Sequence, residues 1–541
     1  MQQFIVEATR IDPHPWTLLE GPGFEILSRC DTRVTQMTAI GILNDLPLQK
    51  ELVPPAYWAA LPTPMTFILF NRKPEEMAAS PLIPDPVRRG GGEDFNWGNS
   101  AQRGRYLTGS LSAADADTLV TVQNEWGVDR LIEQGAEDYG RLQAVGLPTR
   151  LYQCAPALPL WYQAGIAGPY GIYHVQPQPK GMILAAALWI SKADTDALLS
   201  VAKKAKTLPA LPPVADLFGE HPPEGLNSSP RWLAEAALFV RWGLFEQTKN
   251  EPNHRRAFAL FVDRSRSEPV TEALFQECFG FGYAELQSRL SRYFAEAVKE
   301  PLGIRYQSLA GWPPARPALE PRSATAAEIA RILGDWERIE GDTYKATSLA
   351  IGDLYLTQAG KTLHESYAKG ERDPRLLAVL GLYDYDVGNA AEARGFLETA
   401  TEAGVQRPGA YFELAQLNFS QAQAHPAAAG DKFSVEQTAA VLKPLFAAAR
   451  QAPLKAAGYA LMADAWAHCV ARPLPAHLTA LRTGLKLYPR DAALTYSIAS
   501  VHAQWDYKPE AEAIIGTGLK FADDRTAQQF LALRTWLQTG K

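Results

Sequence analysis

The sequence has few cysteines and no long apolar run, and each shortage excludes a class of protein. Its 541 residues include only four cysteines, each more than a hundred residues from the next, at positions Cys30, Cys154, Cys278 and Cys469. That spacing excludes a CxxC metal knuckle or redox pair. It leaves open two long-range disulfides or four buried thiols. The longest apolar stretch, 182–190, is too short for a helix to cross a bilayer.

The chain also lacks an excess of basic residues. It holds 53 Lys and Arg against 59 Asp and Glu, a formal net charge of −6, and no block of basic residues recurs. Because phosphate binding requires a basic face, this balance argues against a nucleic-acid partner. Hydrophobic residues at 47% and charged residues at 21% are typical of a globular protein. The length allows about three to five domains.

A proline-rich segment divides the chain. Four prolines lie between Ser308 and Ser323. Proline lacks a backbone donor and keeps the residue before it out of the helical region. Residues 306–324 are therefore predicted to form an extended linker.

Before the linker, the patterns predict an α+β fold with a small sheet followed by helices. Short apolar runs with β-branched residues predict strands, and apolar residues at helical spacing predict helices. The expected strands are 23–28, 66–70 and 117–122. The expected helices are 231–245, 255–264, 269–279 and 283–300. From about residue 128 onward, helices are expected to predominate.

After the linker, small residues recur at fixed offsets. The first unit is marked by Leu380-Gly381, Gly388, Ala393, Leu397 and Ala400. Leu414-Ala415 follows at the distance of a helix–turn–helix repeat of about 34 residues. Small residues let the two helices of a repeat approach, and large ones fill the space between repeats. Residues 325–541 therefore resemble a tetratricopeptide-repeat (TPR) array, a helical superhelix with an insertion around 422–431.

Two segments of the first half carry a further resemblance. They are Leu158-Pro-Leu-Trp-Tyr-Gln-Ala-Gly-Ile-Ala-Gly168 and the helical tail 273–293. In order and spacing they resemble a bacterial family of gluzincin-type, peptidase-MA-like metallopeptidases that often carry TPR repeats. The resemblance implies one peptidase-like domain, with an α/β part at 1–127 and a helical part at 128–305.

The residues that such a peptidase needs are absent. Zinc hydrolysis of this type uses an HExxH helix and a third carboxylate ligand. No histidine lies between His14 and His174, and residues 140–154, where the motif would fall, contain neither His nor Glu. Ala164 stands where the family has its third ligand, and Gly168 at the family's next acidic position. We therefore predict no catalytic residue, no metal ligand and no cofactor site.

Other candidate sites lack the partners that their chemistry needs. Three histidines are candidate metal ligands, but none has a second histidine at metal-binding spacing. They are His174, His221 in a predicted loop, and His364, which is followed by Glu365. The acidic pairs Glu133/Glu137 and Asp194/Asp196 are more typical of solvated helix faces than of glycosidase sites.

The leading hypothesis is a non-catalytic pseudo-metallopeptidase domain fused to a TPR-like scaffold that binds a protein or peptide in its groove. One alternative is a hydrolase with relocated catalytic residues, for which the candidates are Tyr162, Tyr170, His174 and Arg150. Another is a structural subunit of an envelope or cell-surface assembly. The repeat aromatics Tyr411, Phe412 and Tyr496 are expected in the core between repeats rather than in the groove.

The cellular location, the partner and the oligomeric state do not follow from the residues alone. The resemblance implies an extracytoplasmic location, periplasmic or secreted, if the chain is a mature form, and a cytoplasmic one otherwise. The sequence leaves the partner's identity and the oligomeric state open.

Overall fold

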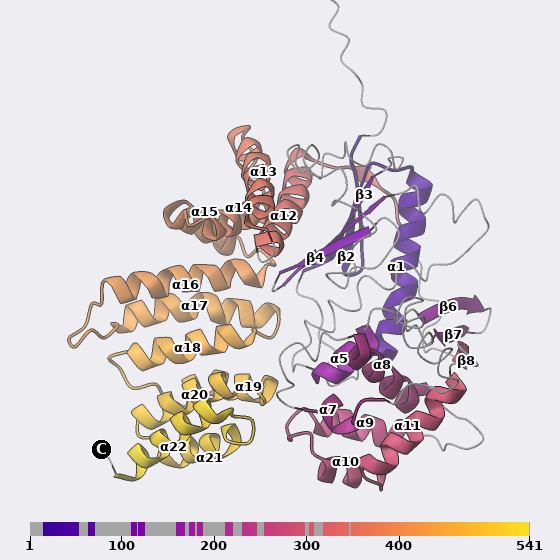
Figure 1. Cartoon of the computed structure of the whole chain (residues 1–541). Helices are drawn as coiled ribbons and strands as arrows, with labels where there is room; N and C mark the ends of the chain where they lie inside the picture. Colours follow the sequence, from indigo (N-terminus) through magenta and orange to yellow (C-terminus); the bar gives the residue numbers. More distant parts are fainter. Residues whose placement is uncertain are drawn as a thin grey trace, which may run out of the picture.

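The structure, a computed structural model, describes the chain in several stretches (Figure 1). These are residues 15–52, 63–70, 110–115, 117–124, 158–167, 173–178, 181–187, 211–219, 230–245, 254–297, 302–307, 318–345 and 348–539. They form a mixed sheet with helices on both faces, a helical cluster with a second sheet, and a C-terminal array of helices (Figure 1).

The main sheet has six strands in the order β4-β5-β3-β2-β1-β9. Its parallel centre consists of β2 (Phe24–Ser28), β3 (Met65–Phe70) and β5 (Leu119–Asn124). These are the three strands that the sequence predicted, each within two residues of its expected start. The outer strands pair antiparallel and are β1 (Thr17–Gly21), β4 (Ser110–Ala114) and β9 (Arg322–Ser323).

A helix covers each face of this sheet (Figure 1). On one face, α1 (Thr32–Leu52) contributes Val34, Ile42 and Leu43 to a buried cluster with alternate residues of β2 and β3. On the other, α12 (Ala326–Lys345) packs Ile332, Trp336 and Ile339 against the opposite sheet residues. Because both faces are buried, the central strands appear in the sequence as continuous apolar runs rather than as alternating patterns.

A helical cluster packs around one aromatic core. Its helices are α5 (Leu160–Ala167), α7 (Val214–Leu217), α8 (Pro230–Phe245), α9 (Arg255–Arg264), α10 (Glu272–Phe279) and α11 (Tyr283–Ala297). The four predicted helices are confirmed in α8 to α11. The third begins at Glu272 rather than at residue 269, because the Thr271 side chain accepts a hydrogen bond from the Leu274 amide and caps the helix there.

The helical part predicted at 128–305 also contains a second sheet, which the helical patterns of this region do not predict. Its antiparallel strands are β6 (Tyr173–Gln178), β7 (Gly181–Ala187) and β8 (Leu302–Gln307). The apolar run at 182–190 lies largely in β7. A short apolar run alone does not distinguish a buried strand from a helix, and β8 lies more than a hundred residues after its neighbour.

Residues 326–539 form a TPR-like array of helical hairpins. The first hairpin pairs α12 with α13 (Leu349–Ala368), and later ones pair α14 (Pro374–Asp386) with α15 (Ala390–Glu402) and α16 (Pro408–Ala424) with α17 (Val435–Gln451). The remaining helices are α18 (Ala456–His468), α19 (Pro475–Leu487), α20 (Ala492–Gln504), α21 (Lys508–Gly518) and α22 (Asp524–Thr539). The first helix of each hairpin also packs on the first helix of the next: α12 on α14, α14 on α16, α16 on α18, and so on to α22.

Small residues permit the close helix pairing, as the repeat pattern predicted. A Cβ atom on Gly381 would lie 2.7 Å from Cγ of Leu397, and Leu397 and Ala400 on α15 are fully buried. The insertion predicted around 422–431 is the loop after α16, where Ala428 and Lys432 form an isolated bridge.

The end of the predicted linker belongs to the sheet. Arg322–Ser323, within 306–324, form β9 beside β1, and α12 follows at once. The helix that opens the repeat half thus also covers a face of the N-terminal sheet, although the sequence analysis placed a boundary between residues 324 and 325. The boundaries themselves stay a prediction.

Two sequence expectations concern cysteines and membranes. Cys30, Cys278 and Cys469 are free thiols, the first and last of them buried, and Cys154 lies outside the described residues. None of the helices in the described stretches combines the length and apolar character that a bilayer crossing requires.

Candidate functional site

The segment that resembles the peptidase family forms α5 and packs in the aromatic core. Trp161 and Tyr162 are buried, and Ala164 packs against the same cluster. A Cβ on Gly165 would lie 2.3 Å from Cγ2 of Val240 and 2.6 Å from the carbonyl oxygen of Ala236. The residue types of this segment are therefore those that close helix packing against α8 requires. Gly168 and residues 140–154 lie outside the described residues.

The other predicted candidates do not assemble into a site in the described part of the chain. His174 lies in β6. His364, on α13, keeps 44% of its side chain exposed and contacts Asp384 Oδ1 at 3.2 Å through Nε2. Within the described stretches no three His, Cys, Asp or Glu side chains converge as metal ligands would. The candidates outside the described residues are Glu133, Glu137, Arg150, Tyr170, Asp194, Asp196 and His221.

Charged side chains do converge where the sheet meets the repeats. We call this cluster the charged junction: Asp115, Asp117, Asp335, Arg338, Asp386 and Arg407. Asp115 and Asp117 lie in the turn between β4 and β5, where Asp115 Oδ1 accepts hydrogen bonds from the amides of Asp117 and Thr118 at 3.1 and 3.0 Å. These bonds fix the turn and direct its carboxylates toward the array.

Two arginines of the array hold these carboxylates. Arg407, just before α16, pairs with Asp115 at 2.7 Å, with Asp117 at 3.0 Å and with Asp335 at 2.9 Å. Arg338, on α12, pairs with Asp386 of α14 at 2.9 Å and also contacts Asp335 and Asp115. The amide of Gly409 donates a further hydrogen bond to Asp117. One buried network therefore connects the sheet edge to three helices of the array.

Further contacts between described residues join the halves. Arg331 on α12 makes a bidentate pair with Glu25 of β2, at 2.8 and 2.7 Å. Farther along the array, Arg490 Nη1 donates to the carbonyl oxygen of Ser265 in the turn after α9, at 2.6 Å. The repeat array is thus attached to the N-terminal half near its beginning and again near its end.

The charged junction holds four acidic side chains and two arginines. Burial and the neighbouring charges shift the pKa values of Asp115 and Asp117. Burial alone would raise the pKa of Asp115, but Arg407 and Arg338 hold it well below its ordinary value. Burial raises the pKa of Asp117 to about 7, and the Asp115 carboxylate adds to the rise against the opposing effect of Arg407. Burial also raises the pKa of nearby Glu413 to about 7, with a contribution from Asp386. The folded protein therefore holds protons here near neutral pH.

Asp117→Asn should make the stability of the protein less sensitive to a rise in pH from about 4 to about 7. An unfolded Asp loses its proton near pH 4, whereas folded Asp117 keeps it to about 7. The folded state then binds more protons between these values, so its stability falls as pH rises through this window and levels off above it. Asn resembles the protonated acid and does not titrate. We expect the stability of the variant relative to wild type to rise by about 1–2 kcal/mol between pH 5 and pH 8.

Urea unfolding at the two pH values measures this difference. The matched control is Asp353→Asn, which changes an exposed Asp on α13. A difference between variant and wild type that stays constant from pH 5 to pH 8 would contradict the role given to Asp117.

Next to the junction, α14 and α16 carry half-buried polar and aromatic side chains. We call this set the inner patch: Tyr385, Asp386, Phe412 and Glu413. A hydrogen bond between Tyr385 and Glu413 connects the two helices. The aromatics Tyr411, Phe412 and Tyr496 all pack against repeat cores, as the sequence predicted. Of the three, Tyr411 is buried and the other two are partly exposed.

The charged junction is not visible in the sequence because its members are remote from one another. Asp115 and Arg407 are separated by 292 residues, and Asp115 and Arg338 by 223. The local signals are slight: two Asp flanking Ala116 between strand-like runs, and an Arg directly before the proline that opens a helix.

Comparison with known proteins finds similarity to TPR structures, among them the following two. A thermophilic TPR protein of Thermus thermophilus is 16% identical over 37% of this chain and 98% of its own, with a TM-score of 0.27. The TPR2AB domain of yeast Sti1, in its complex with pHSP90, is 12% identical over 38% of this chain and 99% of its own, with a TM-score of 0.17. No protein-family model and no curated protein matches the chain. The helical-repeat assignment therefore rests on the helix pairing of this chain itself, and the gluzincin resemblance stays a prediction.

Proposed function

We propose that this protein is a non-catalytic scaffold that binds a protein or peptide partner through its helical-repeat array. The observation that carries the proposal is the stacking of successive hairpins. The first helix of each hairpin packs on the first helix of the next, so these helices form one continuous row along the array. Such repeats form extended surfaces suited to peptides and partner proteins. The inner patch supplies two aromatic rings and two carboxylates on neighbouring helices of that series.

We also propose that the N-terminal half, its α/β part at 1–127 together with its helical part at 128–305, is a pseudo-peptidase domain with a structural role. Support comes from the apolar packing of Ala164, which stands where the resembled family has a zinc ligand. The proposed role is to hold the array at both of its attachment points. This part of the proposal fails if the purified full chain carries stoichiometric zinc and cleaves peptides in a chelator-sensitive way. The extracytoplasmic location stays a prediction.

Phe412→Ala should weaken partner binding. Phe412 lies half-buried on α16 within the inner patch, so its ring is both partly accessible and held by the repeat core. Aromatic contacts of this kind contribute strongly to protein interfaces. Peptides selected from a displayed random library against the full chain should bind the variant at least about tenfold more weakly, a loss of about 1.4 kcal/mol.

The matched control is Phe446→Ala, because Phe446 is also partly exposed, at 37%, but lies on α17, the other helix of the same hairpin. Fluorescence anisotropy with a labelled peptide gives both dissociation constants. Equal losses in the two variants would place the binding surface elsewhere, and failure to select any peptide would contradict the scaffold proposal.

A further inference from the structure

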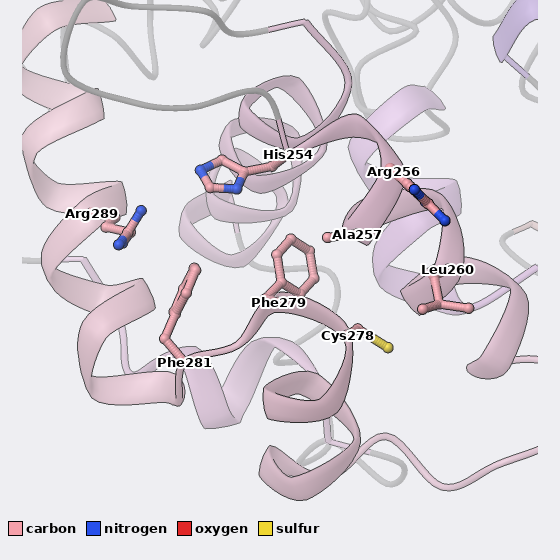
Figure 2. Close-up of a pocket in the computed structure, with 8 residues that line it drawn as sticks. All are labelled: His254, Arg256, Ala257, Leu260, Cys278, Phe279, Phe281 and Arg289. Carbon is pink, nitrogen blue, oxygen red and sulfur yellow. The ribbon is translucent and has the colours of Figure 1, made fainter.

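A pocket of about 440 Å³ lies in the helical cluster, and none of its described lining residues belongs to α5 or to the charged junction (Figure 2). It is formed by the start of α9, the end of α10 and one face of α11. Its volume falls within the range of about 300–1,000 Å³ that is usual for small-molecule sites. Neither the proposed scaffold function nor the peptidase resemblance assigns it a role.

Aromatic rings form the central wall of the pocket. Phe279 stacks on Phe275 of the core at a ring-centroid distance of 4.3 Å, and His254 stacks on buried Trp242 at 4.2 Å. Phe281 lies 6.0 Å from Phe279. These rings are held from behind by the core, so the wall is already in place for a flat apolar ligand.

Among the described residues, the charged groups that line the pocket are all basic. Figure 2 shows Arg289 beside Phe281 on one side of Phe279 and Arg256 on the other. None of the described residues that line the pocket carries a carboxylate. The Arg289 guanidinium lies 4.3 Å above the Phe281 ring, and its Nε donates to Glu285, outside the lining, at 2.9 Å. Arg256 is exposed on α9 near its start, where the partial positive charge of the first turn adds to the field.

A ligand that matches this lining needs a flat apolar body and a negative charge. Guanidinium groups bind carboxylates through paired hydrogen bonds, and aromatic rings stack on one another in offset or edge-on arrangements. We propose that this pocket binds a small aromatic carboxylate, with its ring against Phe279 and Phe281 and its carboxylate at Arg256. Leu260 and the thiol of Cys278 border the site on the Arg256 side (Figure 2).

Calorimetry on the full chain with phenylacetate and 1-naphthoate tests the ligand class. Three comparison probes separate the contributions: 2-phenylethanol lacks the charge, phenethylamine reverses it, and acetate lacks the ring. We expect both aromatic carboxylates to bind at least about tenfold more tightly than any of the three, as charge-assisted hydrogen bonds predict. Absence of binding by both carboxylates at millimolar concentration would overturn the proposal, and so would equal binding of the uncharged alcohol.

Variants of two arginines test the location. Arg256→Gln should weaken 1-naphthoate binding about tenfold and abolish the preference over the uncharged probe. Arg292→Gln is the matched control, because Arg292 is a 63% exposed Arg on α11 that does not line the pocket. Both changes affect exposed side chains, and unchanged thermal unfolding confirms that each variant folds. Equal effects of the two changes would show a general charge effect and contradict the proposed site.

Cys278 gives a readout that is independent of affinity. Burial raises the pKa of this half-buried thiol, so alkylation by iodoacetamide is measured at pH 9, where the reactive thiolate is more populated. We expect 1-naphthoate to slow alkylation of Cys278, measured by peptide mass spectrometry, and phenethylamine to leave the rate unchanged. Binding of 1-naphthoate without protection of Cys278 would place the ligand elsewhere and overturn the assignment.

Discussion

Arg407→Ala should destabilise the protein by about 3–5 kcal/mol, the usual cost of removing one partner from a buried ion pair. The guanidinium of Arg407 contacts three carboxylates, on Asp115, Asp117 and Asp335, and its side chain is 8% exposed. Without it these acids face one another in a buried site with Arg338 as the remaining cation of the junction. The loss should therefore come from uncompensated charge more than from lost packing.

Urea unfolding at pH 7 measures this cost, and hydrogen exchange locates it. We expect faster exchange at the amides of Thr118 and Gly409, which lie in the two elements that Arg407 joins, and unchanged exchange in α20, remote from the junction. The matched control is Arg525→Ala, at an exposed position on α22. A loss below about 1 kcal/mol, or one equal to that of the control, would mean that the network contributes little to holding the halves together.

The predictable parts of the fold have local causes. The α9 helix runs from Arg255 to Arg264, as predicted, because Phe258, Phe261 and Val262 recur at helical spacing and are buried on one side. The repeats were visible because close helix pairing requires Gly381 opposite Leu397, a requirement set within about 20 residues of chain. Periodicity and residue size are short-range properties, so a single sequence displays them.

The missed features depend on distant residues. The double role of α12 could not be foreseen, because its apolar residues fit a repeat core and a sheet face equally well. The charged junction joins the β4–β5 turn to an arginine 292 residues later. The sequence does not distinguish a buried Asp from a solvated one, so the burial and the pairing of Asp115 and Asp117 are visible only in the three-dimensional structure. The pocket on α9 is likewise assembled from three helices.

Trp161 of α5 belongs to the segment 158–168 that resembles the peptidase family, but the structure gives it a packing role in the aromatic core. In the structure it lies at the centre of the aromatic core, with ring centroids 5.3 Å from Phe239, 5.5 Å from Phe261 and 5.5 Å from Phe218. Its conformation is explained by packing alone, so its presence carries no information about catalysis.

Trp161→Ala should accordingly destabilise the protein by about 3–5 kcal/mol, because it leaves a large cavity in a close-packed core. Trp161→Phe should cost only about 1–2 kcal/mol. A ring remains to contact Phe239 and Phe261, and the indole N–H has no hydrogen-bond partner within the described structure. The contrast between the two variants separates packing from hydrogen bonding.

The matched control is Trp536→Ala, because Trp536 is 42% exposed on α22 and its removal should change stability by less than about 0.5 kcal/mol. Urea unfolding followed by circular dichroism compares the three variants with wild type. If Trp161→Phe cost as much as Trp161→Ala, the indole N–H would have to bond a group in the remaining part of the chain. Trp161 would then be a polar anchor for that part, and the packing explanation of the α5 motif would be wrong.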